Sequence, residues 1–154
     1  SPKITFCYRL NQIANISGEK ISQMAFDEIV DNLSEYMGDL YIGYSIYPDR
    51  TTSPGHYVLF IETASPVDTE KRLRYPNAFE EMLCNGNVSV KPLIKSGALG
   101  HCEVKFLRQG TYDEYRQLLK SKGANLNQIK PIKLIKDGEK KEFFLSHVIE
   151  ERTQ

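Results

Sequence analysis

The spacing of apolar residues predicts one long amphipathic helix in the first quarter of the chain. Apolar side chains recur every three or four positions between Ile21 and Met37, which places them on one face of a helix. Gly38 follows at the position where a helix usually stops. We therefore expect a helix over Ile21–Met37. Its apolar face comprises Phe26, Ile29, Val30, Leu33 and Met37.

Segments rich in aromatic and β-branched residues predict the strands. Leu40–Tyr47 and His56–Glu62 have this composition and are joined by a polar loop, so we expect them to pair with each other. Lys3–Tyr8 alternates weakly between apolar and polar residues, and Ile13–Ile16 continues this strand after a polar break. Glu103–Leu107 is the remaining predicted strand.

Start and stop signals predict two shorter helices. Pro76–Cys84 opens with a proline, which suits the first turn of a helix. Thr111 and Glu114 have the spacing of a capping box, and the helix that they open is expected to stop at Gly123. Ser65–Leu73 is polar, and we expect it to be a loop.

The segment after Lys136 has two interpretations. Asp137-Gly138 is a typical hairpin turn. Apolar residues nevertheless recur at helical spacing just beyond it, so we favour a terminal helix. These residues are Phe143, Phe144, His147 and Val148.

Strands and helices that alternate without long crossovers are typical of an α+β architecture. We expect a small mixed or antiparallel sheet of about four strands, flanked by helices. The 154 residues, 40% of them hydrophobic, suffice for one core, so the prediction is a single domain over residues 1–154.

The composition argues against several classes of function. Twenty Lys and Arg balance twenty Asp and Glu, so no net field attracts nucleic acid or anionic lipid. No apolar run approaches the roughly 20 residues that span a bilayer, and the first residues lack the apolar core of a signal peptide. Cys7, Cys84 and Cys102 are far apart in sequence, which argues against a disulfide framework or metal site and favours a cytoplasmic protein.

The residues alone contain no Ser-His-Asp order and no glycine loop for phosphate, so they indicate only a small α+β domain. Two stretches, however, resemble known families. Tyr8–Asn11 and Ile16–Ile21 resemble the junction that opens the C-terminal domain of adenylate-forming enzymes, with its arginine, its hinge residue and its G-E-K-I-like turn. Tyr47–Phe60 resembles the Y-x-D-x-S-x-P-G-H-Y-V-L-F stretch of the Gretchen Hagen family, the auxin-responsive acyl acid amido synthetases.

Later segments extend this resemblance over nearly the whole chain. Leu99–Lys105, Gly110–Tyr112 and Asn127–Pro131 are similar to the G-P-L-E-I-R, G-T-F and Q-Y-K-T-P-R signatures of the family. Ile61 departs from the usual tryptophan. The family arginine of K-T-P-R is also absent unless Lys133 replaces it, and lysine offers a point charge in place of a planar fork.

The resemblance implies that the chain is the mobile C-terminal lid of a larger ligase. Such an enzyme uses ATP with Mg²⁺ to turn a carboxylic acid into an acyl-adenylate, and then transfers the acyl group to an amine such as an amino acid. An N-terminal adenylation domain outside this sequence would bind most of the nucleotide, and residues 1–16 would supply the hinge and first strands. The isolated fragment is expected to be inactive. The alternative is a non-catalytic, ferredoxin-like module for ligand binding or protein interaction.

The resemblance also implies roles for individual residues. Lys130 and Lys20 would carry positive charge to phosphate or adenylate as catalytic residues. For Lys130 the alternative is a solvated surface lysine, and for Lys20 it is an ordinary helix-entry turn in which Glu19 complements the helix dipole. The remaining implied roles belong to Arg9, Gly18 and Lys133 near the nucleotide and to Asn11 as the hinge residue, which is otherwise an ordinary turn asparagine.

Two other features have structural interpretations. Histidine is a common general base, so His56 invites that role, but we interpret it as a strand-entry residue beside a rigid turn. Tyr44, Tyr47 and Tyr57 are interpreted as residues that pack on the face of the sheet.

Overall fold

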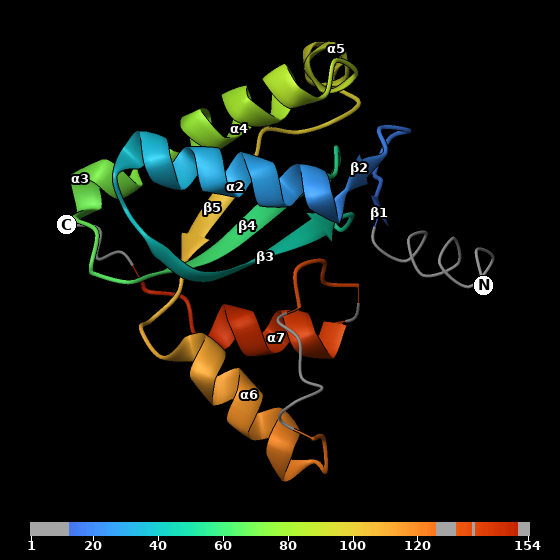
Figure 1. The fold of residues 1–154 in the computed structure, drawn as a ribbon. Coiled ribbons are helices and arrows are strands. Elements are labelled where there is room, and N and C mark those ends of the chain that lie inside the picture. The colour runs from blue at the N-terminus through green and yellow to red at the C-terminus, as the bar shows by residue number, and fades with distance from the viewer. Residues whose placement is uncertain (1–12, 126–131, 137, 151–154) are drawn as a thin grey trace, which may run out of the picture.

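The computed structural model describes residues 13–125, 132–136 and 138–150. It has a three-stranded sheet with helices on both faces and a separate two-stranded ribbon at one end (Figure 1). The predicted α+β class, with a small mixed sheet flanked by helices, is confirmed. Among the described helices, none has the length and hydrophobicity needed to cross a membrane.

The three-stranded sheet has the order β3–β4–β5. β3 (Tyr41–Asp49) pairs antiparallel with β4 (His56–Thr63), as predicted, and β4 pairs parallel with β5 (Glu103–Phe106). β1 (Ile13–Ala14) and β2 (Ile21–Ser22) form the separate antiparallel ribbon, so the strands do not all belong to one sheet. The predicted strand Lys3–Tyr8 lies outside the described residues.

The long helix α2 (Gln23–Met37) confirms the prediction and begins two positions later than expected, because Ile21 and Ser22 pair with β1. The Ser22 hydroxyl caps its start by accepting a hydrogen bond from the Ala25 amide at 3.1 Å. Gly38 ends the helix in the left-handed conformation, with φ at 74°, that a C-terminal cap requires.

Three helices lie between β4 and β5. α4 (Tyr75–Gly86) confirms the predicted helix over Pro76–Cys84, whereas α5 (Val90–Ser96) was not predicted. The loop prediction for Ser65–Leu73 is wrong at α3 (Thr69–Arg72), because the Asp68 carboxylate accepts the Lys71 amide at 2.8 Å and caps one helical turn.

Helix α6 (Thr111–Ser121) forms as predicted, but the capping box is wrong. The Thr111 hydroxyl donates to the Arg108 carbonyl. The Glu114 carboxylate lies 2.9 Å from a ring nitrogen of His147, just after α7. The cap comes from the sheet. The Glu62 carboxylate on β4 accepts hydrogen bonds from the Gly110 amide at 2.8 Å and the Tyr112 amide at 2.9 Å.

The terminal helix α7 (Gly138–Ser146) is also confirmed, and the hairpin interpretation of this segment is wrong. Segments on either side of α7 each bridge to one edge of the sheet. Leu134 forms a parallel bridge with Ile46 of β3, and Val148 forms an antiparallel bridge with Leu107 just after β5. The end of the described chain therefore makes one β-bridge at each edge of the sheet.

The core is divided between the two faces of the sheet, because alternate residues of β4 point to opposite sides. Tyr57, Leu59 and Ile61 pack toward α2 and α4. Val58 and Phe60 pack toward α6 and α7. Figure 1 shows these two helical layers on either side of the strands.

Candidate functional site

The turn between β1 and β2 carries two of the residues implied to act on the nucleotide, Gly18 and Lys20. Gly18 has φ at 101°, a conformation that favours glycine, and its amide donates to the Asn15 side-chain oxygen at 2.7 Å. The Ser17 hydroxyl donates to the Ala98 carbonyl at 2.7 Å, which fastens the turn to the segment before β5.

The buried carboxylate of Glu19 accepts hydrogen bonds from the backbone of this turn. Glu19 is 1% exposed and accepts the Ile16 amide at 2.6 Å and the Ser17 amide at 2.7 Å. The Tyr57 hydroxyl on β4 donates to the same carboxylate. Burial, and next the hydrogen bond to Glu19, raise the pKa of Tyr57 far above its usual value, so the phenol stays protonated and remains the donor.

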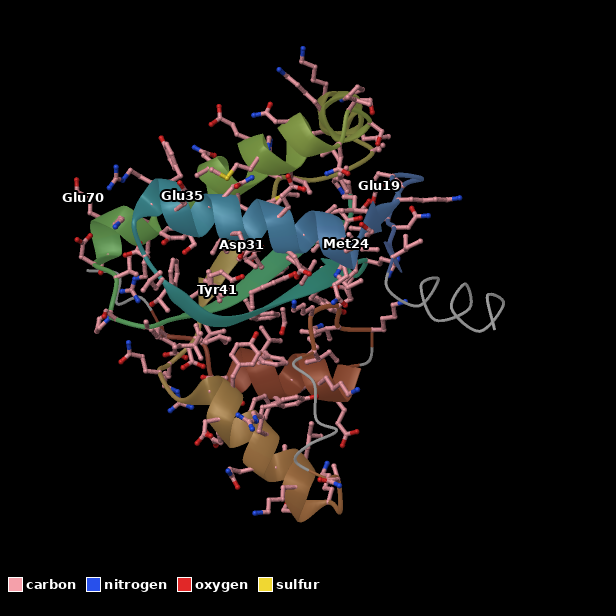
Figure 2. The ribbon with its side chains drawn as sticks, in the orientation of Figure 1. Glu19, Met24, Asp31, Glu35, Tyr41 and Glu70 are labelled. Atoms are coloured by element: carbon pink, nitrogen blue, oxygen red, sulfur yellow. The ribbon has the colours of Figure 1, made fainter. Side chains whose placement is uncertain are left out.

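Lys20 has the opposite environment. Its side chain is exposed and makes no hydrogen bond or ion pair with any other residue that the structure describes. The turn therefore buries the carboxylate at position 19 and presents the ammonium at position 20 to solvent. Figure 2 shows Glu19 beside the two-stranded ribbon and the start of α2, at the opposite end of the molecule from Glu70.

The segment 132–136 carries another implied residue, Lys133. The Lys133 carbonyl accepts the Ile46 amide at 2.7 Å, and the Ile135 amide donates to the Ile46 carbonyl at 2.8 Å, so the segment runs along the edge of β3. The Lys133 ammonium lies 2.8 Å from an Asp27 carboxylate oxygen on α2. The Tyr44 hydroxyl donates to the same oxygen. In this conformation Lys133 is engaged in an ion pair.

Three segments that are far apart in sequence meet around a hollow of about 290 Å³. They are the ribbon from Ile13 to Asn15, the end of β3 with its following loop, and residues 134–136. Arg50 and Lys136 bring positive charge to its lining, and no carboxylate belongs to the described residues that line it. Such a lining suits an anionic group.

Asn15 joins the hollow to the turn. Its side chain holds the Gly18 amide, and its carbonyl accepts a hydrogen bond from the Arg50 guanidinium. The nearby Asp49 carboxylate accepts both the amide and the hydroxyl of Thr51, at 2.8 and 2.6 Å. Burial raises the pKa of Asp49, but these two hydrogen bonds lower it below its usual value overall, so the carboxylate stays ionised and tied to its own loop.

The remaining implied residues, Arg9, Asn11 and Lys130, lie outside the described residues. The segments that follow them, Ile13–Asn15 and 132–136, are described, and both reach the hollow. Sequence reasoning missed Asp27 and Arg50. It considered Glu19 only as a partner for the helix dipole.

The structural interpretations of His56 and the tyrosines agree with the geometry. His56 is buried between the Thr52 hydroxyl at 2.9 Å and the Glu103 carboxylate at 3.1 Å. Tyr44 and Tyr57 are buried against the α2 layer, and Tyr47 is half-buried, with the Lys141 ammonium 4.9 Å from the centre of its ring. Within the described ranges, no group of three or more His, Cys, Asp or Glu residues is placed to hold a metal ion.

The family model of the GH3 family C-terminal domain matches residues 23–139. The chain belongs to this family. The match spans most of the chain and agrees with the resemblance found in the sequence motifs, which is thereby confirmed.

The GH3 relatives are plant enzymes much longer than this chain. The chain is 28% identical over 150 residues to the 4-substituted benzoates-glutamate ligase GH3.12 of Arabidopsis thaliana, a match that covers 90% of the chain and 26% of the relative. It is 30% identical over 139 residues to the probable indole-3-acetic acid-amido synthetase GH3.1 of the same plant, covering 84% of the chain and 23% of the relative. The chain thus spans about a quarter of the length of these relatives.

Solved structures agree with the fold. The GH3.15 acyl acid amido synthetase matches with a TM-score of 0.78 and 20% sequence identity, over 89% of this chain and 25% of that one. A structure of the AtGH3.15 acyl acid amido synthetase in complex with 2,4-DB matches with a TM-score of 0.72 and 22% identity, over 90% of this chain and 26% of that one. At these identities the match establishes the fold of a GH3 C-terminal domain.

Proposed function

We propose that this chain is the mobile C-terminal domain of a larger, ATP-dependent acyl acid amido synthetase. The enzyme would convert a carboxylic acid into an acyl-adenylate with release of pyrophosphate, and then transfer the acyl group to an amine such as an amino acid. ATP with Mg²⁺ would be bound mainly by an N-terminal adenylation domain. With Cys84 and Cys102 both free thiols, the proposed location is the cytoplasm.

One observation carries this proposal beyond family membership. The segments that follow the implied hinge and the implied catalytic lysine come together around one hollow, and Arg50 and Lys136 line it. An acyl-phosphoryl transfer needs positive charge where phosphate charge builds up. The hollow lies beside the Gly18 turn, since Asn15 contributes to both. The positive charge of the hollow and the neighbouring Gly18 turn support the proposal that this end of the domain meets the nucleotide.

In the proposed reaction, Lys130 acts on the phosphates during adenylate formation, and Lys20 acts in the other orientation of the lid. Asn11 is the pivot, with Arg9 close to the nucleotide. Gly18 lets the turn approach the ligand closely because it has no side chain. Lys133 can contact the nucleotide only after it leaves Asp27, to which it is bound in this structure.

The deciding experiment uses the full-length protein and measures ATP–pyrophosphate exchange with a panel of carboxylic acids. Wild-type protein should exchange pyrophosphate in the presence of at least one acid. Lys130→Ala should lower the exchange rate by about 10²–10³, the usual result of losing one preorganised electrostatic donor. The 154-residue chain alone should show no exchange.

A matched lysine serves as the control. Lys122 is an exposed residue at the C-terminal end of α6, so Lys122→Ala should leave exchange within about twofold of wild type. Absence of exchange in wild-type protein with every acid would contradict the proposed function. Equal losses in Lys130→Ala and Lys122→Ala would instead remove Lys130 from the site.

The hinge can be tested separately. Asn11→Pro fixes φ near −65° and should restrict the pivot, so it should impair one half-reaction more than the other. The rates of pyrophosphate exchange and of amine transfer from preformed acyl-adenylate give the ratio. An equal loss in both would make Asn11 a structural residue.

A further inference from the structure

Glu19 is a buried carboxylate that links the turn between β1 and β2 to strand β4 by hydrogen bonds. A carboxylate is costly to bury unless its oxygens are hydrogen-bonded, and here three donors meet it. Two are the consecutive backbone amides of Ile16 and Ser17, at 2.6 and 2.7 Å. The third is the Tyr57 hydroxyl from the central strand β4. The turn is therefore joined to the middle of the sheet through a single side chain.

The turn is also fixed on its other sides. The Asn15 side chain holds the Gly18 amide, and the Ser17 hydroxyl reaches the Ala98 carbonyl. Residues 15–19 thus have few ways to move relative to β4. Lys20 follows directly, so the fixed turn determines where its backbone lies and in which direction its exposed side chain leaves the domain.

We propose that Glu19 is a positioning residue for Lys20: its carboxylate, braced by Tyr57, holds the turn so that the Lys20 ammonium is presented to the phosphate or adenylate of the bound intermediate. This inference rests on the proposed function. Glu19 itself faces the core and does not touch the substrate. Its effect on the reaction is transmitted through the backbone of the turn.

A second buried carboxylate in the same molecule provides a matched control. Glu62 is 3% exposed and accepts two backbone amides, those of Gly110 and Tyr112, at 2.8 and 2.9 Å. It stands on the same strand as Tyr57 but faces the other layer and caps α6. Glu19→Gln and Glu62→Gln therefore make the same chemical change at a similar depth, and only the first touches the turn with Lys20.

The experiment measures both half-reactions of the full-length protein: pyrophosphate exchange, and amine transfer from preformed acyl-adenylate. Glu19→Gln should change the ratio of the two rates about tenfold, because a small misplacement of a catalytic group can cost up to about 10² in rate. Glu62→Gln should leave the ratio within about twofold of wild type, even where it lowers stability as much.

A double-mutant cycle tests whether Glu19 acts through Lys20. If it does, Lys20→Ala impairs the same half-reaction as Glu19→Gln, and the double variant is no slower than Lys20→Ala alone. Tyr57→Phe keeps the carboxylate and removes one brace, so it should shift the ratio in the same direction by about threefold. This milder variant carries the test if Glu19→Gln does not fold.

The outcomes separate the two proposals. Wild-type protein without exchange overturns the proposed function, and the positioning role of Glu19 with it. Active wild-type protein in which Glu19→Gln changes the ratio no more than Glu62→Gln overturns only the positioning role. Multiplied effects of Glu19→Gln and Lys20→Ala also overturn it, because independent contributions would mean that Glu19 does not act through Lys20.

Discussion

The two faces of the sheet are packed in different ways. On the α2 and α4 face, twenty-one buried hydrophobic residues of the described chain form one cluster, and tyrosine hydroxyls at its margin reach carboxylates. On the α6 and α7 face, the corresponding cluster has seven buried residues among those described, and aromatic rings dominate it. Phe144 lies at its centre, with the rings of Phe60, Tyr112 and Tyr115 between 5.4 and 5.9 Å away.

This difference has consequences for local stability. A smaller cluster removes less apolar surface from water, so it contributes less to holding its helices in place. Opening of the α6–α7 layer should therefore cost less free energy than global unfolding, while the α2–α4 layer should open only when the whole domain unfolds. The turn that carries Lys20 is joined to the larger cluster, on the α2 and α4 face, by the hydrogen bond between Glu19 and Tyr57. Its geometry should thus survive fluctuations of α6 and α7.

The largest expected effect comes from removing the central ring of the smaller cluster. Phe144→Ala should lower the free energy of unfolding by about 3–5 kcal/mol, because a large buried ring is lost. Hydrogen exchange should show that amides of α6 and α7 lose protection first. The matched variant on the other face is Phe79→Ala in α4, also fully buried, which should reduce protection throughout. The same pattern of exchange in both variants would contradict the division into two layers.

An intermediate effect is expected where the smaller layer is tied to β4 by a carboxylate. Glu62→Ala leaves the Gly110 and Tyr112 amides without their acceptor and should cost about 2 kcal/mol, as the loss of a helix cap does. Urea denaturation measures this loss. The amides at the start of α6 should exchange faster, whereas those of the turn at residues 16–17 should not change. Faster exchange at both places would mean that the two layers are coupled.

A smaller effect is expected from single hydroxyl groups. Tyr112→Phe removes the hydrogen bond between this hydroxyl and Ser45, at 2.7 Å, and should cost about 1 kcal/mol. Tyr57→Phe removes a hydrogen bond to a carboxylate and should cost about 1.5–2 kcal/mol, since bonds to charged groups contribute more. Thermal unfolding of the two variants gives the order. Equal losses would mean that the hydrogen bond from Tyr57 to Glu19 contributes no more than the one between Tyr112 and Ser45.

The smallest effect is expected at the ion pair that links α2 to the segment after residue 131. Lys133 and Asp27 are both about one-third exposed, so Lys133→Ala should cost less than about 1 kcal/mol and the loss should shrink in high salt. Asp27→Asn should cost more than Lys133→Ala, because the Tyr44 hydroxyl also donates to the Asp27 carboxylate. If Lys133→Ala lowered pyrophosphate exchange while Asp27→Asn raised it, release from Asp27 would be a step in nucleotide binding.

Local signals account for what the sequence predicted. Helix α2 was predictable because its apolar face and its Gly38 stop lie within one stretch of chain. The Ser22 cap was not recognised, so the predicted start at Ile21 was two positions early. The cap of α6 was not predictable, because Thr111 and Glu114 have the right spacing but the acceptor that meets the Gly110 amide lies 48 residues earlier, at Glu62. The short α3 and α5 carry little periodicity, so a loop was the natural interpretation of the first.

The candidate site depends even more on contacts between residues that are far apart in the sequence. The Gly18 turn was found from its motif, but the burial of Glu19 depends on Tyr57, 38 residues away on β4. The pairing of Lys133 with Asp27 joins residues 106 positions apart. A spacing rule within one sequence cannot detect such contacts. Family motifs located the segments that meet at the hollow, whereas the contacts that fix them required the structure.

The bridges that the end of the described chain makes to both sheet edges have a practical consequence for where the chain can be shortened. Leu134 bridges to β3, and Val148 bridges to Leu107 just after β5. A version that ended before Ile132 would remove both bridges and would uncover Phe60 by removing α7. Exposed edges beside apolar surface invite strand pairing between molecules. Such a truncated chain should aggregate, whereas one that extends past Ile149 should remain monodisperse at the same concentration.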